Sequence, residues 1–239
     1  MKMPRLISAL LFLNLVFVPH LQAETPEEKG LAIAVEADKR DEGFQDSVAI
    51  LTMVLSNRQG QESIRKLKIK TFEMADKSVG DKSLVIFDSP RDVMGTAFLT
   101  HSKILEPDDQ WIYLPALSGR IKRISSSNKS GPFMGSEFAY EDMASREVGK
   151  YSYKWLRDEA CGDLTCFVVE AYPLYEKSGY TKLISWVDTT EYRTLKTEFY
   201  NRRGDLLKVL ELSDYNLYLE KYWRPHNLHM EIIITVKKT

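Results

Sequence analysis

The sequence predicts a mainly β protein that is built from antiparallel strands and has at most two helices. From about residue 46 onward, apolar residues recur with a period of two, and turn pairs such as Gly80-Asp81 and Ser118-Gly119 separate the segments. The segments follow one another too closely for the helices of parallel βαβ units. The predicted strands are 46–57, 62–75, 82–88, 96–104, 110–115, 119–125, 150–159, 165–174, 180–188, 192–202, 205–213 and 225–237.

Residues 25–42 are predicted to form the main helix. Thr25-Pro26-Glu27-Glu28 is typical of a helix N-terminus, because proline suits the first turn and acidic side chains interact well with the positive end of the helix dipole. Gly43 is a suitable stop. The second helical candidate is 135–147, and 90–95 is a candidate turn.

The first 23 residues have the pattern of a secretory signal peptide. Lys2 and Arg5 precede an apolar run of about 13 residues, which ends at Val18, and Ala23 offers a small residue at the cleavage point. A membrane-spanning helix needs roughly 20 apolar residues. We therefore predict cleavage after Ala23 and, for residues 24–239, a single exported domain in a bacterial periplasm.

Composition and motifs argue against several classes of function. The formal net charge of the 239 residues is -1, which leaves no basic excess for binding nucleic acid. No HExxH, GxSxG or phosphate-binding glycine loop is present, and His226 and His229 are three residues apart, which does not suit a metal site on one strand. We expect no catalytic residue, no cofactor and no metal. The absence of heptads favours a monomer.

Cys161 and Cys166 flank a Gly162-Asp163 turn between two predicted strands. A disulfide would close a loop of six residues across this hairpin and contribute about 2 kcal/mol. A redox pair is the alternative, but redox cysteines usually have C-x-x-C spacing at a helix start. We predict a structural disulfide.

Two of the predicted strands are apolar on both faces, namely 48–55 and 84–87. In an antiparallel sheet, this pattern means that both sides are covered there. A large sheet also curls readily, and its inner face then either encloses a ligand cavity or packs into a filled core. The pattern alone leaves both alternatives open.

The stretch 106–143 carries a long motif. It contains Trp111-Ile112-Tyr113-Leu114-Pro115-Ala116-Leu117, then Arg120 and Arg123-Ile124, then Phe133-Met134-Gly135-Ser136-Glu137-Phe138 and Tyr140-Glu141-Asp142. This motif resembles that of the periplasmic outer membrane lipoprotein-sorting protein family, a branch of the LolA/LolB-like superfamily. The departures are Pro132, where serine is usual, and Ser136-Glu137 in place of the commoner Thr-Asp.

The resemblance implies an unclosed antiparallel β-barrel of about eleven strands with a few capping helices. It also implies a cavity that takes acyl chains of lipoproteins or other lipids and carries them toward the outer membrane. The partners it suggests are an RND/MMPL-type inner-membrane exporter or an outer-membrane receptor. A lipid sensor or adaptor that binds a membrane partner, and a cofactor-free enzyme on the same fold, are the alternatives.

The motif supplies candidate site residues. The candidates for lining a ligand cavity or forming its lid are Trp111, Tyr113, Leu114, Phe133, Met134, Phe138 and Tyr140. For residues 130–135 the alternative to a lid is a buried connector, and the aromatic residues also suit an ordinary core. Arg120 and Arg123 are predicted to pair with Glu141 and Asp142 as a gate that opens on ligand entry. The alternative for these charges is a structural ion pair or a solvated face.

Overall fold

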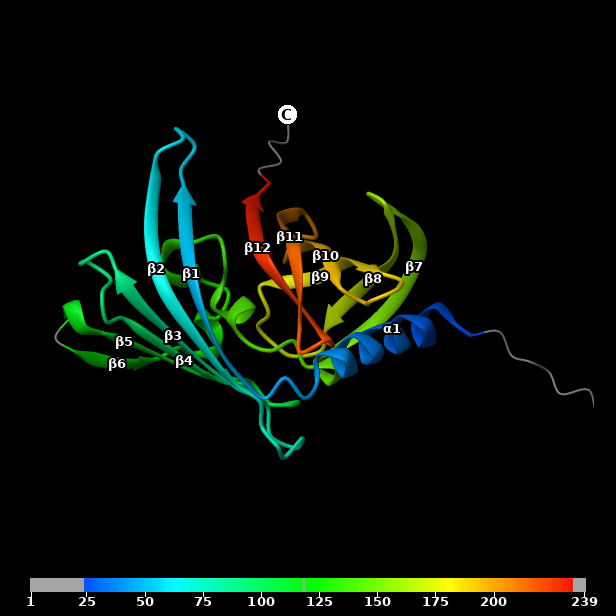
Figure 1. Ribbon diagram of the computed structural model, residues 1–239, viewed down its shortest axis with the longest axis horizontal. Coiled ribbons are helices and arrows are strands. Elements are labelled where there is room, and N and C mark those ends of the chain that lie inside the picture. Colours follow the sequence, from blue (N-terminus) through cyan, green and yellow to red (C-terminus); the bar gives the residue numbers. More distant parts are fainter. Residues whose placement is uncertain (1–23, 118, 234–239) are drawn as a thin grey trace, which may run out of the picture.

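The computed structural model describes residues 24–117 and 119–233. These residues form one α-helix and two six-stranded antiparallel sheets that face each other without closing into a barrel (Figure 1). The helix is α1 (Pro26–Asp41). The first sheet contains β1 (Asp46–Ser56), β2 (Glu62–Phe72), β3 (Lys82–Ser89), β4 (Ala97–His101), β5 (Asp109–Leu114) and β6 (Arg120–Arg123). The second contains β7 (Tyr151–Cys161), β8 (Leu164–Pro173), β9 (Tyr180–Asp188), β10 (Thr194–Asn201), β11 (Leu206–Tyr218) and β12 (Tyr222–Ile232).

Neighbouring strands in each sheet are consecutive in sequence, as in a meander. The predicted fold class is confirmed: the protein is mainly β, antiparallel and unclosed, with twelve strands divided between two sheets in the described residues. The predicted strand boundaries are close to the observed ones, because turn residues in the sequence mark where most strands end. The predicted last strand, 225–237, corresponds to β12, and residues 234–237 of it lie outside the described residues, as does the predicted signal peptide.

α1 begins as the sequence predicts and packs on the second sheet. Thr25 is its N-cap: the Thr25 hydroxyl accepts from the Glu28 backbone N–H at 3.2 Å, and the Glu28 carboxylate accepts from the Thr25 N–H at 2.8 Å. At Gly30 the helix approaches β7 so closely that a Cβ atom would lie 2.6 Å from the Trp155 backbone nitrogen. No helix among residues 24–117 and 119–233 is long and apolar enough to cross a membrane.

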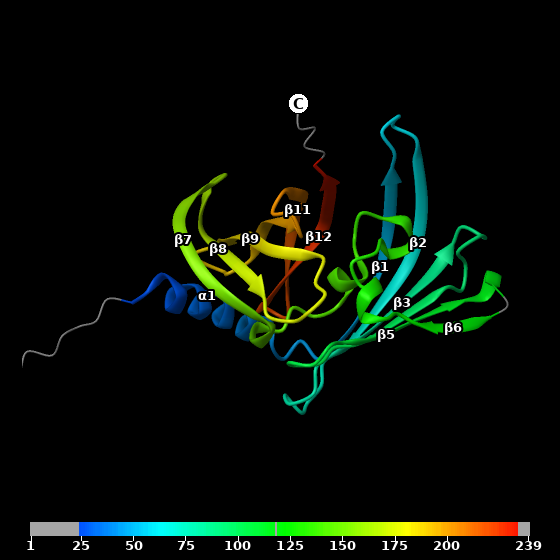
Figure 2. The same cartoon turned by 180° about the vertical axis from the view of Figure 1, so that it is seen from behind.

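The core of the first sheet lies on one face, which we call its inner face. Leu67, Val85, Phe98 and Ile112 are buried there. They pack against Phe133, from the segment 124–150 between β6 and β7, which we call the connector. The rings of Phe98 and Phe133 have centroids 5.1 Å apart. The connector therefore fills the inner face of the first sheet from the side of the second (Figure 2).

The predicted helix 135–147 is wrong. The connector folds back on itself: the Phe133 N–H donates to the Phe138 carbonyl at 2.6 Å, and the Tyr140 N–H donates to the Gly131 carbonyl at 3.1 Å. Met134 and Gly135 have φ angles of 51° and 76°, which a helix does not allow. Loop-closing hydrogen bonds replace the helical pattern, and Tyr140–Met143 forms only a short 3-10 turn.

The predicted disulfide is confirmed. Cys161 and Cys166 are bonded at the end of the β7–β8 hairpin, with their Cα atoms 6.0 Å apart. Cys166 is fully buried and packs with Val168 and Trp186. The bond therefore joins the hairpin end to a small core on the face of the second sheet that carries these residues.

Candidate functional site

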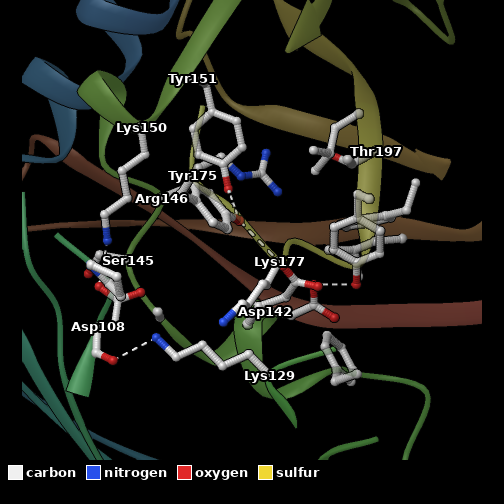
Figure 3. Close-up of a pocket in the computed structure, with 18 of the residues that line it drawn as sticks. Asp108, Lys129, Asp142, Ser145, Arg146, Lys150, Tyr151, Tyr175, Lys177 and Thr197 are labelled. Carbon is white, nitrogen blue, oxygen red and sulfur yellow. Dashed lines mark hydrogen bonds and ion pairs between the residues drawn. The ribbon is translucent and has the colours of Figure 1, made fainter. Parts of the chain in front are cut away.

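A cavity of about 390 Å³ lies between the second sheet and the connector (Figure 3). Ligand pockets typically measure roughly 300–1,000 Å³. Its sheet side is mostly apolar and is contributed by β9 to β12. The apolar residues on that side are Leu183, Phe199, Leu210, Leu212, Leu228 and Met230.

Strand register explains why these apolar residues form one wall. Leu210 on β11 lies opposite Met230 on β12, and Leu212 lies opposite Leu228. On β10, Phe199 lies opposite Leu183 of β9. Residues that lie opposite each other in an antiparallel pair point to the same face of the sheet. We call this the inner face of the second sheet.

One end of the cavity is a hydrogen-bonded polar network. The Lys150 ammonium lies 2.5 Å from the Asp108 carboxylate, and Lys129 donates to the Asp108 carbonyl at 2.6 Å (Figure 3). Both lysines are buried, and burial lowers the pKa of Lys129. These bonds fix the connector, which contains both lysines, to Asp108 just before β5.

Glu141 attaches the connector to the loop before β9. Its carboxylate accepts hydrogen bonds from the Gly179 backbone N–H at 2.8 Å, the Ser178 hydroxyl at 3.0 Å and the Tyr175 hydroxyl at 3.3 Å. Burial raises the pKa of Glu141 in spite of these donors. The connector side of the cavity therefore carries a carboxyl group, and burial disfavours the ionised form of this group.

Asp142 attaches the connector to β11. Its carboxylate lies 2.6 Å from the ammonium of Lys208, whose side chain is 2% exposed, and accepts from the Tyr180 hydroxyl at 2.8 Å. Burial, together with the neighbouring carboxylates, raises the pKa of Tyr180. The Lys208–Asp142 pair is thus a buried ion pair between the connector and β11.

The remaining part of the cavity reaches solvent. Arg146 and Lys177 are exposed there, together with Glu106 and Glu176. Arg146 lies beside Tyr151 and Tyr175, whose hydroxyl oxygens are 3.2 Å apart (Figure 3). Burial raises the pKa of both tyrosines, so they are neutral hydrogen-bond donors and acceptors at neutral pH.

One of the seven predicted ligand residues, Phe138, lines the cavity. It also lines a second, more open hollow of about 400 Å³ on the other side of the connector. Leu114, Met134 and Tyr140 pack against the core of the first sheet. Phe133 is fully buried in that core, whereas Ser130, Pro132 and Gly135 are exposed.

The side chains of Trp111 and Tyr113 point away from the core of the first sheet. They alternate along β5 with Ile112, which is buried on the inner face, and side chains alternate between the faces of a strand. Tyr113 is 38% exposed. The two aromatic residues therefore lie on the outer face of the first sheet, which is the face opposite Leu67, Val85 and Ile112.

The predicted gate between the arginines and the two carboxylates is wrong. Arg123 pairs with Asp109 on the neighbouring strand, and Arg120 is exposed on β6. Glu141 and Asp142 turn toward the second sheet, where the partners described above satisfy them. Arg123 lies opposite Trp111, on the face of the first sheet that points away from the connector.

Sequence reasoning missed most of the apolar wall and also missed Lys208. One signal was present: Lys208, Leu210 and Leu212 alternate along β11, which places a lysine on an otherwise apolar face. Such a lysine is rarely buried without a partner. In the described residues, no group of three or more His, Cys, Asp or Glu side chains converges as a metal site would require.

The chain matches a family model that is described only as an uncharacterized protein, over residues 80–239. The solved structure of an outer membrane lipoprotein-sorting protein domain from Vibrio parahaemolyticus is 53% identical in sequence, with a TM-score of 0.83, and the match covers 86% of each chain. The chain belongs to the outer membrane lipoprotein-sorting protein family. None of the curated proteins matches it.

Two further structures have a similar fold. A DUF1329 family protein from Desulfovibrio piger is 28% identical, with a TM-score of 0.81 and 87% of each chain covered. A LolA superfamily protein from Nitrosomonas europaea is 22% identical, with a TM-score of 0.67 and 87% of each chain covered. The fold of this chain is therefore LolA/LolB-like.

Proposed function

We propose that the protein is a periplasmic carrier that holds an acyl chain of a lipid or lipoprotein in the cavity and moves it toward the outer membrane. The observation that carries the proposal is the apolar wall of the cavity, built from Leu183, Phe199 and the alternating residues of β11 and β12. The 53% identical relative, which is named for lipoprotein sorting, supports the same role.

The physical requirement on a carrier is affinity that is sufficient for transport yet low enough for release. Each buried methylene group contributes roughly 0.8 kcal/mol. About ten methylene groups against the apolar wall contribute about 8 kcal/mol, which corresponds to micromolar affinity before the cost of ordering is subtracted. Met230 adds an adaptable side chain to this wall.

The exposed part of the cavity suits the polar end of such a ligand. Arg146 and Lys177 would interact with an anionic head group there, and the neutral hydroxyls of Tyr151 and Tyr175 would offer hydrogen bonds. The acyl chain would extend from this opening toward Leu228 and Met230.

Several parts of this proposal rest on the family resemblance. Residues 1–23 would act as a signal peptide that is removed after Ala23, and residues 24–239 would act as one monomeric carrier domain. An RND/MMPL-type exporter in the inner membrane or a receptor in the outer membrane would be its partner. The carrier role requires no catalytic residue and no cofactor.

Native mass spectrometry of the chain from Glu24 onward tests cavity binding. We expect co-purifying or added phospholipid or lipopeptide to remain bound. Leu228 lines the cavity and is 44% exposed, so Leu228→Trp should fill the cavity without overpacking the core and should abolish binding. Leu217→Trp is the matched control, because Leu217 is 48% exposed on the adjacent strand and does not line the cavity. Equal lipid binding by the two variants would contradict the proposal.

A further inference from the structure

The outer face of the first sheet is apolar and is not covered by any part of the chain that the structure describes. The sequence predicts cover on both sides of 48–55 and 84–87, but the connector covers the inner side alone. Ile50 is 78% exposed and Val48 is 62% exposed. An antiparallel sheet with one solvated face normally carries polar residues on that face. The exposed apolar side chains therefore suit contact with another apolar surface.

Strand register arranges this face in two adjacent rows that cross all six strands. Residues opposite each other share a face, so each row is a continuous line of side chains. The first row is Val48, Lys70, Leu84, Leu99, Trp111 and Arg123. The second row is Ile50, Lys68, Ile86, Ala97, Tyr113 and Ile121. Ile121, at the far end of the second row, is 72% exposed.

The charges on these rows are all positive. Lys66, Lys68 and Lys70 alternate along β2, and within the described residues none of the three forms an ion pair. Lys70 lies between Val48 and Leu84, and Lys68 has apolar neighbours in the same way. Carboxylates begin in the next row, where Asp109 pairs with Arg123 and Lys103.

The outer face of the second sheet provides a comparison. Its lysines are matched by acids: Lys182 lies 2.6 Å from Glu170, and Lys196 lies 2.6 Å from Glu198. Such paired charges are typical of a solvated surface. The two outer faces therefore differ, because the first combines exposed apolar side chains with lysines that form no ion pair in the described residues.

We propose that the outer face of the first sheet is a docking surface for an anionic lipid membrane. Lysine stems lie along apolar surface while their ammonium groups reach outward, which suits a phosphate layer above an apolar one. Trp111 and Tyr113 have the amphipathic rings that concentrate at membrane interfaces. A second copy of this chain would place one lysine row against another, and like charges in register repel. The proposal does not depend on the cavity ligand.

Vesicle sedimentation with the chain from Glu24 onward tests the charge requirement, since the apolar run of residues 1–23 would itself bind lipid. We expect binding to phosphatidylcholine vesicles that contain phosphatidylglycerol, weaker binding at high salt, and little binding to phosphatidylcholine alone. Each lysine near an anionic surface contributes about fivefold, so Lys66→Glu with Lys70→Glu should weaken binding by at least about 30-fold. Lys39→Glu with Arg203→Glu makes the same charge change at exposed sites elsewhere and is the control.

A second pair of variants tests the apolar requirement. Val48→Thr with Ile50→Thr keeps the charge and the β-branched shape, so folding should be unaffected while binding to anionic vesicles falls several-fold. Leu164→Thr, at the β7–β8 turn, should bind like the unmodified chain. Equal binding to neutral and anionic vesicles, or unchanged binding by both multiple variants, would overturn the proposal. A dimer in sedimentation velocity that these variants dissociate, without vesicle binding, would also overturn it and assign the face to a second copy.

Discussion

Lys208 and Asp142 form a buried ion pair, so the substitution of either side chain should be costly. Lys208→Met would leave the buried Asp142 carboxylate without its cation, and removal of one partner of a buried pair costs about 3–5 kcal/mol. Urea unfolding would measure the loss. Adding Asp142→Asn to Lys208→Met should recover part of it, because the uncompensated charge is removed. Equal stability of the single and double variants would contradict this account.

Glu141 should make folding depend on pH in the acidic range. Burial raises the pKa of Glu141 above its ordinary value of 4.5, so the folded protein binds this proton more tightly than the unfolded chain does. Stability from this group is therefore present at acidic pH and lost as the pH rises above about 4.5. Glu141→Gln should flatten this decline in the free energy of unfolding. Glu176→Gln, at the exposed edge of the cavity, should keep the original slope, and an unchanged slope in Glu141→Gln would refute the assignment.

At the scale of residues, sequence reasoning located the connector but not its contacts. The motif singled out Phe138, Glu141 and Asp142, and all three line the cavity. Their partners Lys208 and Gly179 are far along the chain, and period-two patterns do not say which strand a loop residue will meet. The arginine gate failed for the same reason, because Asp109 on the neighbouring strand was closer to Arg123 than any connector carboxylate.

The contact between α1 and β7 depends on the absence of a side chain at Gly30. A Cβ atom there would lie 2.6 Å from the Trp155 nitrogen and 2.8 Å from Lys154 backbone atoms, which cannot move aside as a flexible side chain would. Gly30→Ala should therefore displace the helix and cost about 1–3 kcal/mol, despite the better helix propensity of alanine. Thermal unfolding and hydrogen exchange of α1 would report the change.

Leu31→Ala is the matched control for Gly30→Ala. Leu31 is on the same helix and is 46% exposed, so this substitution should change stability by less than about 0.5 kcal/mol. A Gly30→Ala protein that unfolds at the temperature of the Leu31→Ala protein would show that the helix docks less tightly than the structure indicates.

At the scale of elements, the prediction from sequence was largely sufficient. The twelve predicted strands correspond to twelve observed strands, and α1 begins at the expected position, with Thr25 and Glu28 as its capping residues. The prediction failed at 135–147, where the left-handed Gly135 and the hydrogen bonds back to Phe133 and Gly131 produce a folded loop. Such loop closure depends on tertiary contacts with both sheets, which no local pattern contains.

At the scale of the whole molecule, the two sheets have different roles. The inner face of the first sheet is filled by the connector, whereas that of the second sheet leaves a cavity of about 390 Å³ with an apolar wall. That some of the apolar residues bind a ligand remains a proposal, and the cavity is the part of the structure where a ligand would bind. Trp111 and Tyr113, which the sequence analysis suggested as lining residues of a ligand cavity, instead lie on the outer face of the first sheet.

Transfer of a labelled acyl chain between vesicles tests the central claim most directly. Donor vesicles would carry a fluorescent lipopeptide or phospholipid, and acceptor vesicles would carry a quencher. The account predicts that the chain from Glu24 onward accelerates transfer in proportion to its concentration, that Leu217→Trp does the same, and that Leu228→Trp does not. Lipid binding without accelerated transfer, or equal transfer by Leu228→Trp and Leu217→Trp, would contradict the claim that this protein is a carrier that uses the cavity beside β12.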